Sequence, residues 1–243
     1  MEIKLELMTN LQLAVKKVNT DFVLFWDKDI NLARRIELEN IPVFNSARAI
    51  ELCDDKAKTY LELLGTVPQP KTIVAPKCFF KEDLTEFIEA AAEELGLPLV
   101  YKQCFGSFGA QVHLCNSVEE IKALADEKPF ILQEFVKESA GQDVRIEVIG
   151  GKAVAGVKRS NKNDFRSNVT NGGEMEYFVP SREQESLAVS ACRRLGLDFA
   201  GVDILMSNQV CEVNSNAHII NLMKSTGIDT APLIFNEILR KIR

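Results

Sequence analysis

The stretch at 201–216, GVDILMSNQVCEVNSN, decides the fold because it combines a strand pattern with polar residues that a buried sheet disfavours. We predict two antiparallel strands, GVDILM and VCEVN, joined by a two-residue turn at Ser207 and Asn208. This pairing sets Asp203 opposite Glu212. Like charges at opposed positions destabilise a strand pair, and a cation between them removes that cost. The stretch therefore favours a cation site.

Alternation along the two strands separates an apolar face from a polar face. The same pairing puts Leu205 opposite Val210. The face expected in the core carries Val202, Ile204, Cys211 and Val213. The other face carries Asp203, Glu212 and Asn214. Carboxylate and amide oxygens are ligands of a hard cation, and Mg²⁺ combines few protein ligands with substrate phosphates. The alternative is a hairpin whose polar face is exposed to solvent and binds no cation.

Composition indicates an ordinary soluble globular protein, since 46% of the 243 residues are hydrophobic and 26% are charged. A net charge of −6 argues against a nucleic-acid binder. The longest apolar runs have strand length, so no membrane span is expected. Six scattered cysteines without a CxxC pair predict free thiols in a reducing cytoplasm. Seven basic against four acidic residues in 137–166 favour a small anionic ligand.

Strand and helix patterns divide the chain into three parts. Strands at 3–7, 21–26 and 41–45 alternate with helices, the first capped by Asn10, which predicts a small parallel sheet. The proline-rich segment 66–76 is typical of a linker. The middle part has the order helix, strand, strand, helix, strand. The last part has antiparallel patterns, with Gly150 and Gly151 predicted as a hairpin turn.

Basic and glycine-bearing segments add the pattern of an anion site. Lys102 ends a strand just before a turn whose small residues let backbone N–H groups approach an anion. These small residues are Gly106, Ser107 and Gly109. A later strand carries Asp143, Arg145 and Glu147 on one face, and further cations follow at Lys158, Arg159 and Arg166. Each charge taken singly fits a solvated sheet face, whereas together with the acid pair they resemble a phosphoryl-transfer site.

These segments together resemble the ATP-grasp superfamily, specifically the RimK-like α-L-glutamate ligases, over about residues 40–243. The resemblance depends on the ordered series LCDDKAKTYLELLG, VYKQCFGSFGAQV, LQEFVKESAGQDVRIEVIGG, VKRSNKNDFRSNVTNGG, AGVDIL, EVNSN and TGID. It implies an α/β and α+β fold in which two α+β subdomains clasp ATP behind a short parallel-sheet pre-ATP-grasp domain. The implied boundaries are 1–66 for this first domain, 67–136 for the lid subdomain and 137–243 for the large subdomain.

The resemblance also implies a role for each matched residue. Nucleotide contacts would come from Lys56, Lys102, Gly106, Ser107, Gln133, Glu134, Phe135, Val136, Asp143 and Lys158. Within this set, Gln133–Val136 match the hinge between the subdomains, where Glu134 and the Val136 backbone would meet adenine. Asp143 matches the ribose-binding residue. The magnesium ligands would be Asp203, Glu212 and Asn214, with Mn²⁺ as a substitute metal. Arg159, Arg166 and Asn168 match positions near the γ-phosphate and the reacting carboxylate.

The implied activity is a carboxylate–amine ligase that passes through an acyl phosphate. Its expected partners are a small-molecule or peptide carboxylate and an amino acid such as glutamate, without nucleic acid or membrane. A nucleotide-binding protein that has lost catalysis, and a ligase of the D-alanine type, stay open as alternatives.

The chain departs from the family pattern in three places. The loop NSNAHII replaces the common Asn-Ala-Ser-Pro-Gly, so Asn216 and His218 are expected to mark a different substrate. Phe105 and Phe108 in the glycine turn predict a lid that closes differently. The first domain is short, so either the natural reading frame begins before Met1 or the domain is trimmed. A trimmed sheet exposes an edge that a second copy of the chain would cover.

Overall fold

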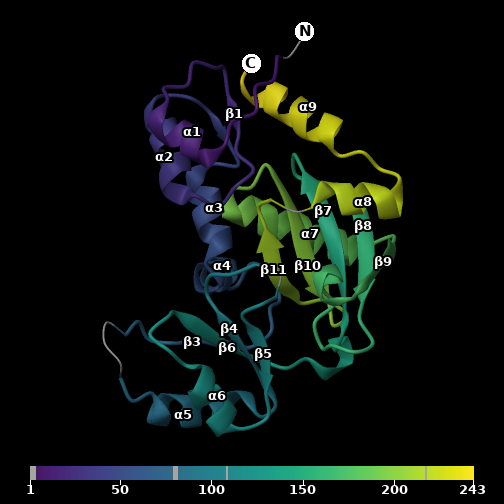
Figure 1. Ribbon diagram of the computed structural model, residues 1–243. Helices are drawn as coiled ribbons and strands as arrows, with labels where there is room; N and C mark the ends of the chain where they lie inside the picture. Colours follow the sequence, from purple (N-terminus) through teal and green to yellow (C-terminus); the bar gives the residue numbers. More distant parts are fainter. Residues whose placement is uncertain (1–3, 79–81, 108, 217) are drawn as a thin grey trace.

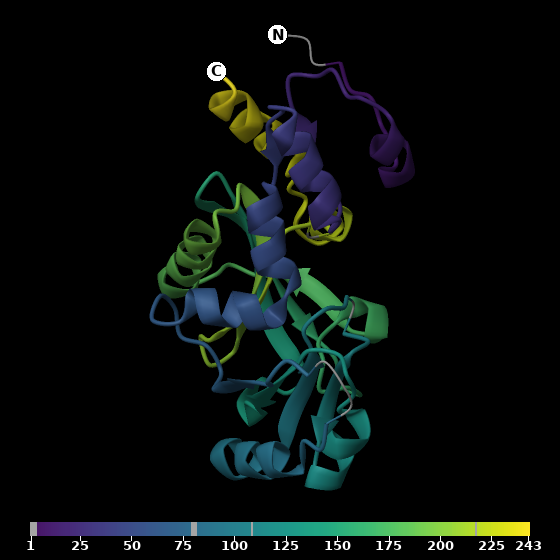
Figure 2. The same cartoon turned by 90° about the vertical axis from the view of Figure 1, so that its left-hand side faces the viewer.

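The computed structural model describes residues 4–78, 82–107, 109–216 and 218–243. Three groups of elements follow one another along the long axis of the molecule (Figures 1 and 2). The N-terminal helices lie at one end, a five-stranded sheet lies in the middle, and a four-stranded sheet with two helices lies at the other end. No helix among these residues has the length and apolar character needed to cross a lipid bilayer.

The N-terminal part packs helices against a two-stranded parallel sheet. Its elements are α1 (Asn10–Val15), β1 (Val23–Leu24), α2 (Ile30–Leu38) and β2 (Val43–Phe44). The strand expected at 3–7 is wrong for the described residues 4–7, where Leu7 is 98% exposed, because no apolar neighbour covers the alternating side chains. Helix α1 is capped by Thr9 rather than Asn10, in a capping box with Gln12.

A short helix pair leads from this part toward the middle sheet. Helices α3 (Ala47–Asp54) and α4 (Lys56–Leu63) meet at Asp55, whose side chain accepts hydrogen bonds from the first turn of α4. The preceding Asp54 forms an ion pair with Lys28 at 2.9 Å. Both helices pack on the middle sheet through Cys53 and Leu63.

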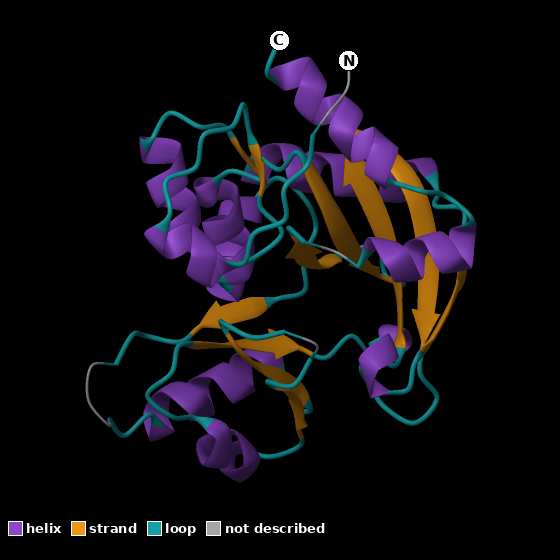
Figure 3. Cartoon of the chain, turned by 45° about the horizontal axis from the view of Figure 1, so that its top comes forward, coloured by secondary structure: helices purple, strands orange, loops and turns teal. Residues whose placement is uncertain are grey.

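The four-stranded antiparallel sheet has the order β3-β6-β4-β5 and carries two helices on one face (Figure 3). Its elements are β3 (Thr72–Val74), α5 (Thr85–Leu95), β4 (Leu99–Gln103), β5 (Val112–Cys115), α6 (Val118–Leu124) and β6 (Phe130–Glu134). The expected linker therefore ends in an edge strand, because β3 pairs with β6 from Thr72 to Val74. Tyr101 and Phe130 stack in the core beneath the helices.

The five-stranded antiparallel sheet has the order β11-β10-β7-β8-β9. Its strands are β7 (Gln142–Ile149), β8 (Lys152–Ser160), β9 (Glu174–Tyr177), β10 (Phe199–Leu205) and β11 (Val210–Asn214), with short 3₁₀ turns at Lys137–Ser139 and Val169–Asn171. Gly150 and Gly151 both have positive φ, so the predicted β7–β8 hairpin turn is confirmed.

The two faces of the large sheet have different covers. Helix α7 (Arg182–Leu195), capped by Ser181 and ended by Gly196, buries Val144, Ile146 and Val202 on one face. Helix α8 (Ile219–Thr226) covers part of the other face through Leu222, and α9 (Ala231–Lys241) closes the end of the sheet beside β1 and β2. The part of the second face that α8 leaves uncovered faces the four-stranded sheet.

Candidate active site

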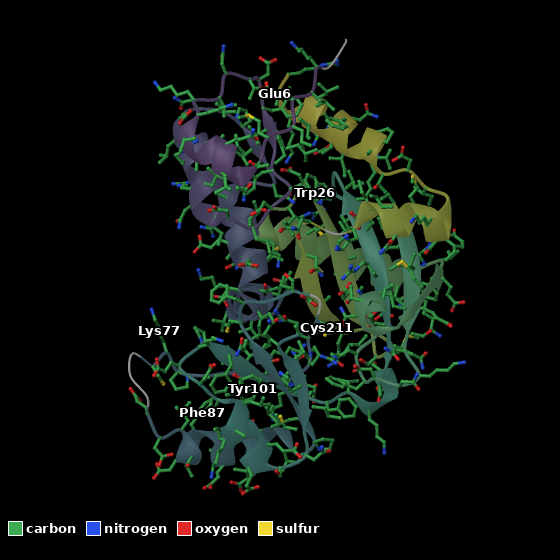
Figure 4. All side chains as sticks on the ribbon, in the orientation of Figure 1. Glu6, Trp26, Lys77, Phe87, Tyr101 and Cys211 are labelled. Carbon is green, nitrogen blue, oxygen red and sulfur yellow. The ribbon has the colours of Figure 1, made fainter. Side chains whose placement is uncertain are left out.

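A cleft between the two sheets encloses about 920 Å³, including space open to solvent. Figure 4 places Cys211 where the large sheet meets the small one. The cleft brings together residues from all the segments predicted to form an anion and cation site. Predicted residues that line it are Lys56, Lys102, Gly106, Gln133, Glu134, Phe135, Val136, Asp143, Arg159, Arg166, Asn168, Asp203 and Glu212.

The small sheet contributes a buried lysine with one well-defined partner. Lys102 donates from Nζ to Oε1 of Gln133 at 2.7 Å, and Gln133 donates from Nε2 to the Thr72 hydroxyl at 2.8 Å. Sγ of Cys211 lies 3.5 Å from the same Nζ. These two hydrogen bonds fix the Lys102 ammonium group at the floor of the cleft, where it would face a bound anion.

The glycine turn after Lys102 is held from two sides. Lys56 donates from its backbone N–H to the Cys104 carbonyl at 3.0 Å and from Nζ to the Gly106 carbonyl at 3.4 Å. From the loop between β8 and β9, Arg166 donates from Nη1 to the Gly109 carbonyl at 2.7 Å. Gly106 and Gly109 thus line the cleft between two cations. The expectation for Phe108 lies outside the described residues.

The large sheet contributes a network of two carboxylates and two guanidiniums. Arg159 donates to both oxygens of Asp143 at 2.7 and 2.5 Å, and its Nη2 lies 2.9 Å from Oδ2 of Asp203. Arg145 donates to the two oxygens of Asp203 at 2.6 and 2.7 Å. The Ser167 hydroxyl donates to Asp143 at 2.6 Å. The network fixes both carboxylates on the cleft face of the sheet.

Asp203 is ionised in this network despite its burial. Burial works to raise the pKa of the Asp203 carboxyl, but the charges of Arg145 and Arg159 outweigh it and hold that pKa below its usual range. Oδ1 accepts only the Arg145 Nε–H among the hydrogen bonds of the described residues, which leaves it a lone pair for a further ligand.

The predicted opposition of Asp203 and Glu212 is confirmed, whereas the predicted register between this pair and the turn is wrong. Ile204, not Leu205, pairs with Val210, and the register shifts between Asp203 and Ile204. This bulge adds a residue to β11 and turns Cys211 to the cleft face, while Val210 takes the core position that alternation predicted for Cys211. A bulge beside the acid pair thus adds a thiol to the site.

Of the two expected metal ligands on β11, Glu212 fits a cation better than Asn214. Among the described residues, no hydrogen bond or ion pair reaches the Glu212 carboxylate, although it lines the cleft. Nδ2 of Asn214 is buried and finds no partner among those residues, but this nitrogen is a hydrogen-bond donor and does not bind a cation. The described part of the chain contains no group of three or more His, Cys, Asp and Glu side chains able to hold a metal. The expected ligands, two carboxylates and the oxygen of an amide, would form a set of hard oxygen ligands.

Some expected residues lie away from the cleft. Lys158 is opposite Val144 across the β7–β8 pair, so it belongs to the α7 face of the sheet and does not reach the cleft. Ser107, Asn214 and Asn216 are not among the cleft-lining residues. His218 precedes α8 and borders a second hollow instead.

The second hollow encloses about 510 Å³ on the same face of the large sheet, including space open to solvent. It shares Arg159 and Asn168 with the cleft, so the two spaces adjoin. Arg145 and Glu147 also line it. Strand alternation predicted that Arg145 and Glu147 share a face with Asp143, and both were counted among the charges that resemble a phosphoryl-transfer site, but neither was given a role of its own. Their alternation with Val144, Ile146 and Val148 is the signal that pointed to them.

Comparison with known proteins identifies the fold family. The RimK-like ATP-grasp domain model matches residues 53–238. An uncharacterized protein of Mycoplasma genitalium is 30% identical over 90% of this chain and 83% of its own length. A probable α-L-glutamate ligase of Maridesulfovibrio salexigens is 35% identical over 82% of this chain and 68% of its own length. β-Citrylglutamate synthase B of Danio rerio is 33% identical over 94% of this chain, which spans 58% of that enzyme.

Solved structures agree on the fold. D-alanine–D-alanine ligase of Bacillus anthracis, complexed with ATP, superimposes with a TM-score of 0.73 at 18% identity, over 96% of this chain and 84% of that one. The ATP-grasp ligase PsnB, complexed with its minimal precursor, Mg and ADP, gives a TM-score of 0.64 at 22% identity, over 88% and 67%. The cleft between two sheets, the matched domain and these relatives lead to one conclusion. The chain belongs to the RimK-like ATP-grasp family, whose ligases form carbon–nitrogen bonds.

Proposed function

We propose that the chain uses ATP and a divalent cation to activate a carboxylate as an acyl phosphate and to join it to the amine of glutamate or another amino acid. The observation that carries the proposal is the cleft, where cations from both sheets face an acid pair. The relatives named as glutamate ligase and citrylglutamate synthase support glutamate as a substrate. The acceptor would be a small molecule or a peptide end.

The nucleotide would lie between the two sheets. Lys56 and Lys102 would neutralise phosphates, while the backbone of 133–136 would meet the adenine at the edge of β6. Because the Glu134 carboxylate already accepts the backbone N–H of Lys71 at 2.8 Å, it also fixes the geometry of this edge. Asp143 lies on the opposite wall, where it would meet the ribose.

A magnesium ion would be held by Asp203, Glu212 and Asn214 together with phosphate oxygens of the nucleotide. The Glu212 carboxylate, which has no hydrogen bond or ion pair among the described residues, supports this donor set. Mg²⁺ suits such a site because it binds through few carboxylates plus substrate phosphates, and Mn²⁺ would also serve. When bound, the ion supplies charge neutralisation at the phosphate oxygens.

The chain's own residues would stabilise and position the reacting groups. Arg159 and Arg166 supply positive charge beside the transferred phosphoryl group, and their partners Asp143 and Asp164 hold the guanidiniums in place before substrate arrives. Asn168 lies where the cleft and the second hollow adjoin, so its amide would orient the carboxylate under attack.

The experiment is ADP release measured over a panel of amino acids and carboxylates, with product masses determined. We expect at least one pair to give a product whose mass is the sum of both substrates less water. Nucleotide binding without amide formation from any pair would indicate a non-catalytic binding protein. Product from D-alanine alone would assign the chain to the D-alanine branch.

Replacing Glu212 tests the metal assignment. Glu212→Gln should reduce ATP turnover at least about 100-fold, equal to about 2.7 kcal/mol of transition-state stabilisation, because the amide loses the charge that holds the cation. The matched control is Glu176→Gln, which removes an exposed carboxylate from the edge strand β9. Unchanged turnover in Glu212→Gln would refute the proposed metal ligands.

A further inference from the structure

The second hollow contains a buried carboxylate that the proposed chemistry has not used. Glu147 is 2% exposed and lies on β7, one alternation beyond Arg145 on the same face. It lines the hollow together with His218 and Asn221. Neither ATP phosphates nor the metal ligands require a carboxylate at this position.

Glu147 has no partner among the described residues. No hydrogen bond or ion pair in the described part of the chain reaches its carboxylate. The nearest cation in sequence, Arg145, gives Nε and Nη2 to Asp203 instead. Burial raises the pKa of Glu147 to about 7, with the Arg145 charge opposing this shift and the Asp203 charge adding to it.

An unpaired buried carboxylate is costly, and a cationic ligand removes that cost. The amine substrate of a carboxylate–amine ligase carries such a cation, because amino groups are protonated at neutral pH. The hollow adjoins the cleft at Arg159 and Asn168, so a ligand there would lie beside the reacting carboxylate. Charge, burial and position therefore agree.

We propose that the Glu147 carboxylate binds the ammonium group of the amine substrate in this second hollow. The inference rests on the proposed ligase activity and names the residue that selects the amine. It predicts that Glu147 contributes to the binding of a protonated amine but not to the binding of an uncharged nucleophile.

The test compares the wild type with Glu147→Gln, which keeps the shape of the side chain and removes its charge. Amide formation is measured with L-glutamate, and with any other amino acid that gives product in the panel. Hydroxylamine, which is uncharged at neutral pH, is the second nucleophile and yields a hydroxamate from the same activated carboxylate. Glu176→Gln, on the opposite face of the sheet, is the control variant.

We expect Glu147→Gln to raise the KM for the amino acid about 10- to 100-fold, the loss typical of a hydrogen bond to a charged group. Hydroxamate formation and the KM for ATP should stay within about two-fold of the wild type. Glu176→Gln should match the wild type in every assay.

Two results would overturn the inference while leaving the ligase activity in place. One is an unchanged KM for the amino acid. The other is an equal loss with hydroxylamine, which would mean that Glu147 supports the fold or the activation of the carboxylate. A wild type that forms no amide with any amine would instead refute the proposed function, and this inference with it.

Discussion

Buried acidic residues on the cleft face differ in how their charge is compensated. Asp143 and Asp203 each have an arginine partner at 2.7 Å or less, whereas Glu147 has none among the described residues. A paired carboxylate keeps its charge at little cost, but an unpaired one disfavours the ionised form. The difference has a measurable consequence for stability against pH.

Glu147→Gln should stabilise the protein at pH 8 by at most about 3 kcal/mol, because it removes an uncompensated buried charge. In the folded state, the pKa of Glu147 is raised from 4.5 to about 7, so the folded state binds more protons between these values. The wild type therefore loses stability as pH rises from about 4.5 to 7, and the variant lacks this loss. Urea unfolding of both proteins at pH 5, 6, 7 and 8 measures this difference in the free energy of unfolding. Parallel stability profiles for the two proteins would contradict it.

At this scale, the sequence could identify Asp203 and Glu212 as a facing pair because strand alternation and turn position are local properties. It could not supply their partners. Arg145 and Arg159 are on other strands, and only the order β10-β7-β8 brings both guanidiniums to Asp203. The lack of a partner for Glu147 could not be predicted either, because a period of two gives the face of a residue but not whether a cation lies nearby.

Among the elements, the β7–β8 hairpin turn was predicted correctly, whereas the bulge in β11 was missed and the N-terminal strand was wrong. Gly150 and Gly151 identify a turn by themselves, since both need positive φ. The bulge at Cys211 had no such signal, because an extra residue in a strand changes the alternation by one position without changing the composition. The strand expected at 3–7 failed for the opposite reason: its alternation was clear, but no neighbouring strand covers its described residues 4–7.

The loop that carries Arg166 and Asn168 is fixed to the sheet by Gly141. Its N–H donates to the Phe165 carbonyl at 2.8 Å, and its carbonyl accepts from the Asn161 N–H at 2.8 Å. Gly141 has φ +69°, and a Cβ there would lie 2.3 Å from the Asn161 carbonyl oxygen. Backbone atoms cannot move aside as a side chain can, so any larger residue displaces the loop.

Gly141→Ala should therefore cost about 1–3 kcal/mol of stability and reduce ATP turnover at least about 10-fold, because the loop residues that face the phosphoryl group are displaced. Gly196→Ala is a matched control, since Gly196 has φ +73° but no described atom lies within 4 Å of the point that a Cβ would occupy. It should cost about 1–2 kcal/mol and leave turnover unchanged. Denaturant unfolding and ADP release measure both effects. Equal turnover in the two variants would contradict the role of Gly141.

For the molecule as a whole, the order of the parts could be predicted from the sequence, but not which faces meet. The RimK-like match begins at residue 53, beyond the two-stranded sheet. In the structure, that sheet packs through Phe44 against Phe199 and Ile238, so it shares a core with β10 and α9. Trp26 also stacks on Phe199 with ring centroids 5.2 Å apart. The N-terminal part is thus joined to the strand pair that carries the acid pair.

Asn45 is the polar link in this junction. It is 1% exposed, and its Nδ2 donates to the carbonyls of Phe199 and Ser215 at 2.8 and 2.9 Å. Its Oδ1 accepts from the Asp198 N–H at 2.7 Å. Ser215 directly follows the proposed metal ligand Asn214. The Asn45 side chain therefore holds the backbone at the end of β11.

Asn45→Ala should reduce the free energy of unfolding by about 2–4 kcal/mol, because several buried backbone groups lose the side chain that pairs with them. It should also lower ATP turnover in the folded protein, since the segment after Asn214 is no longer held. Urea unfolding and ADP release at saturating Mg²⁺ measure the two effects, with the exposed Asn19→Ala as control. A folded variant with full turnover would show that the N-terminal part stabilises the large sheet without positioning the metal ligands.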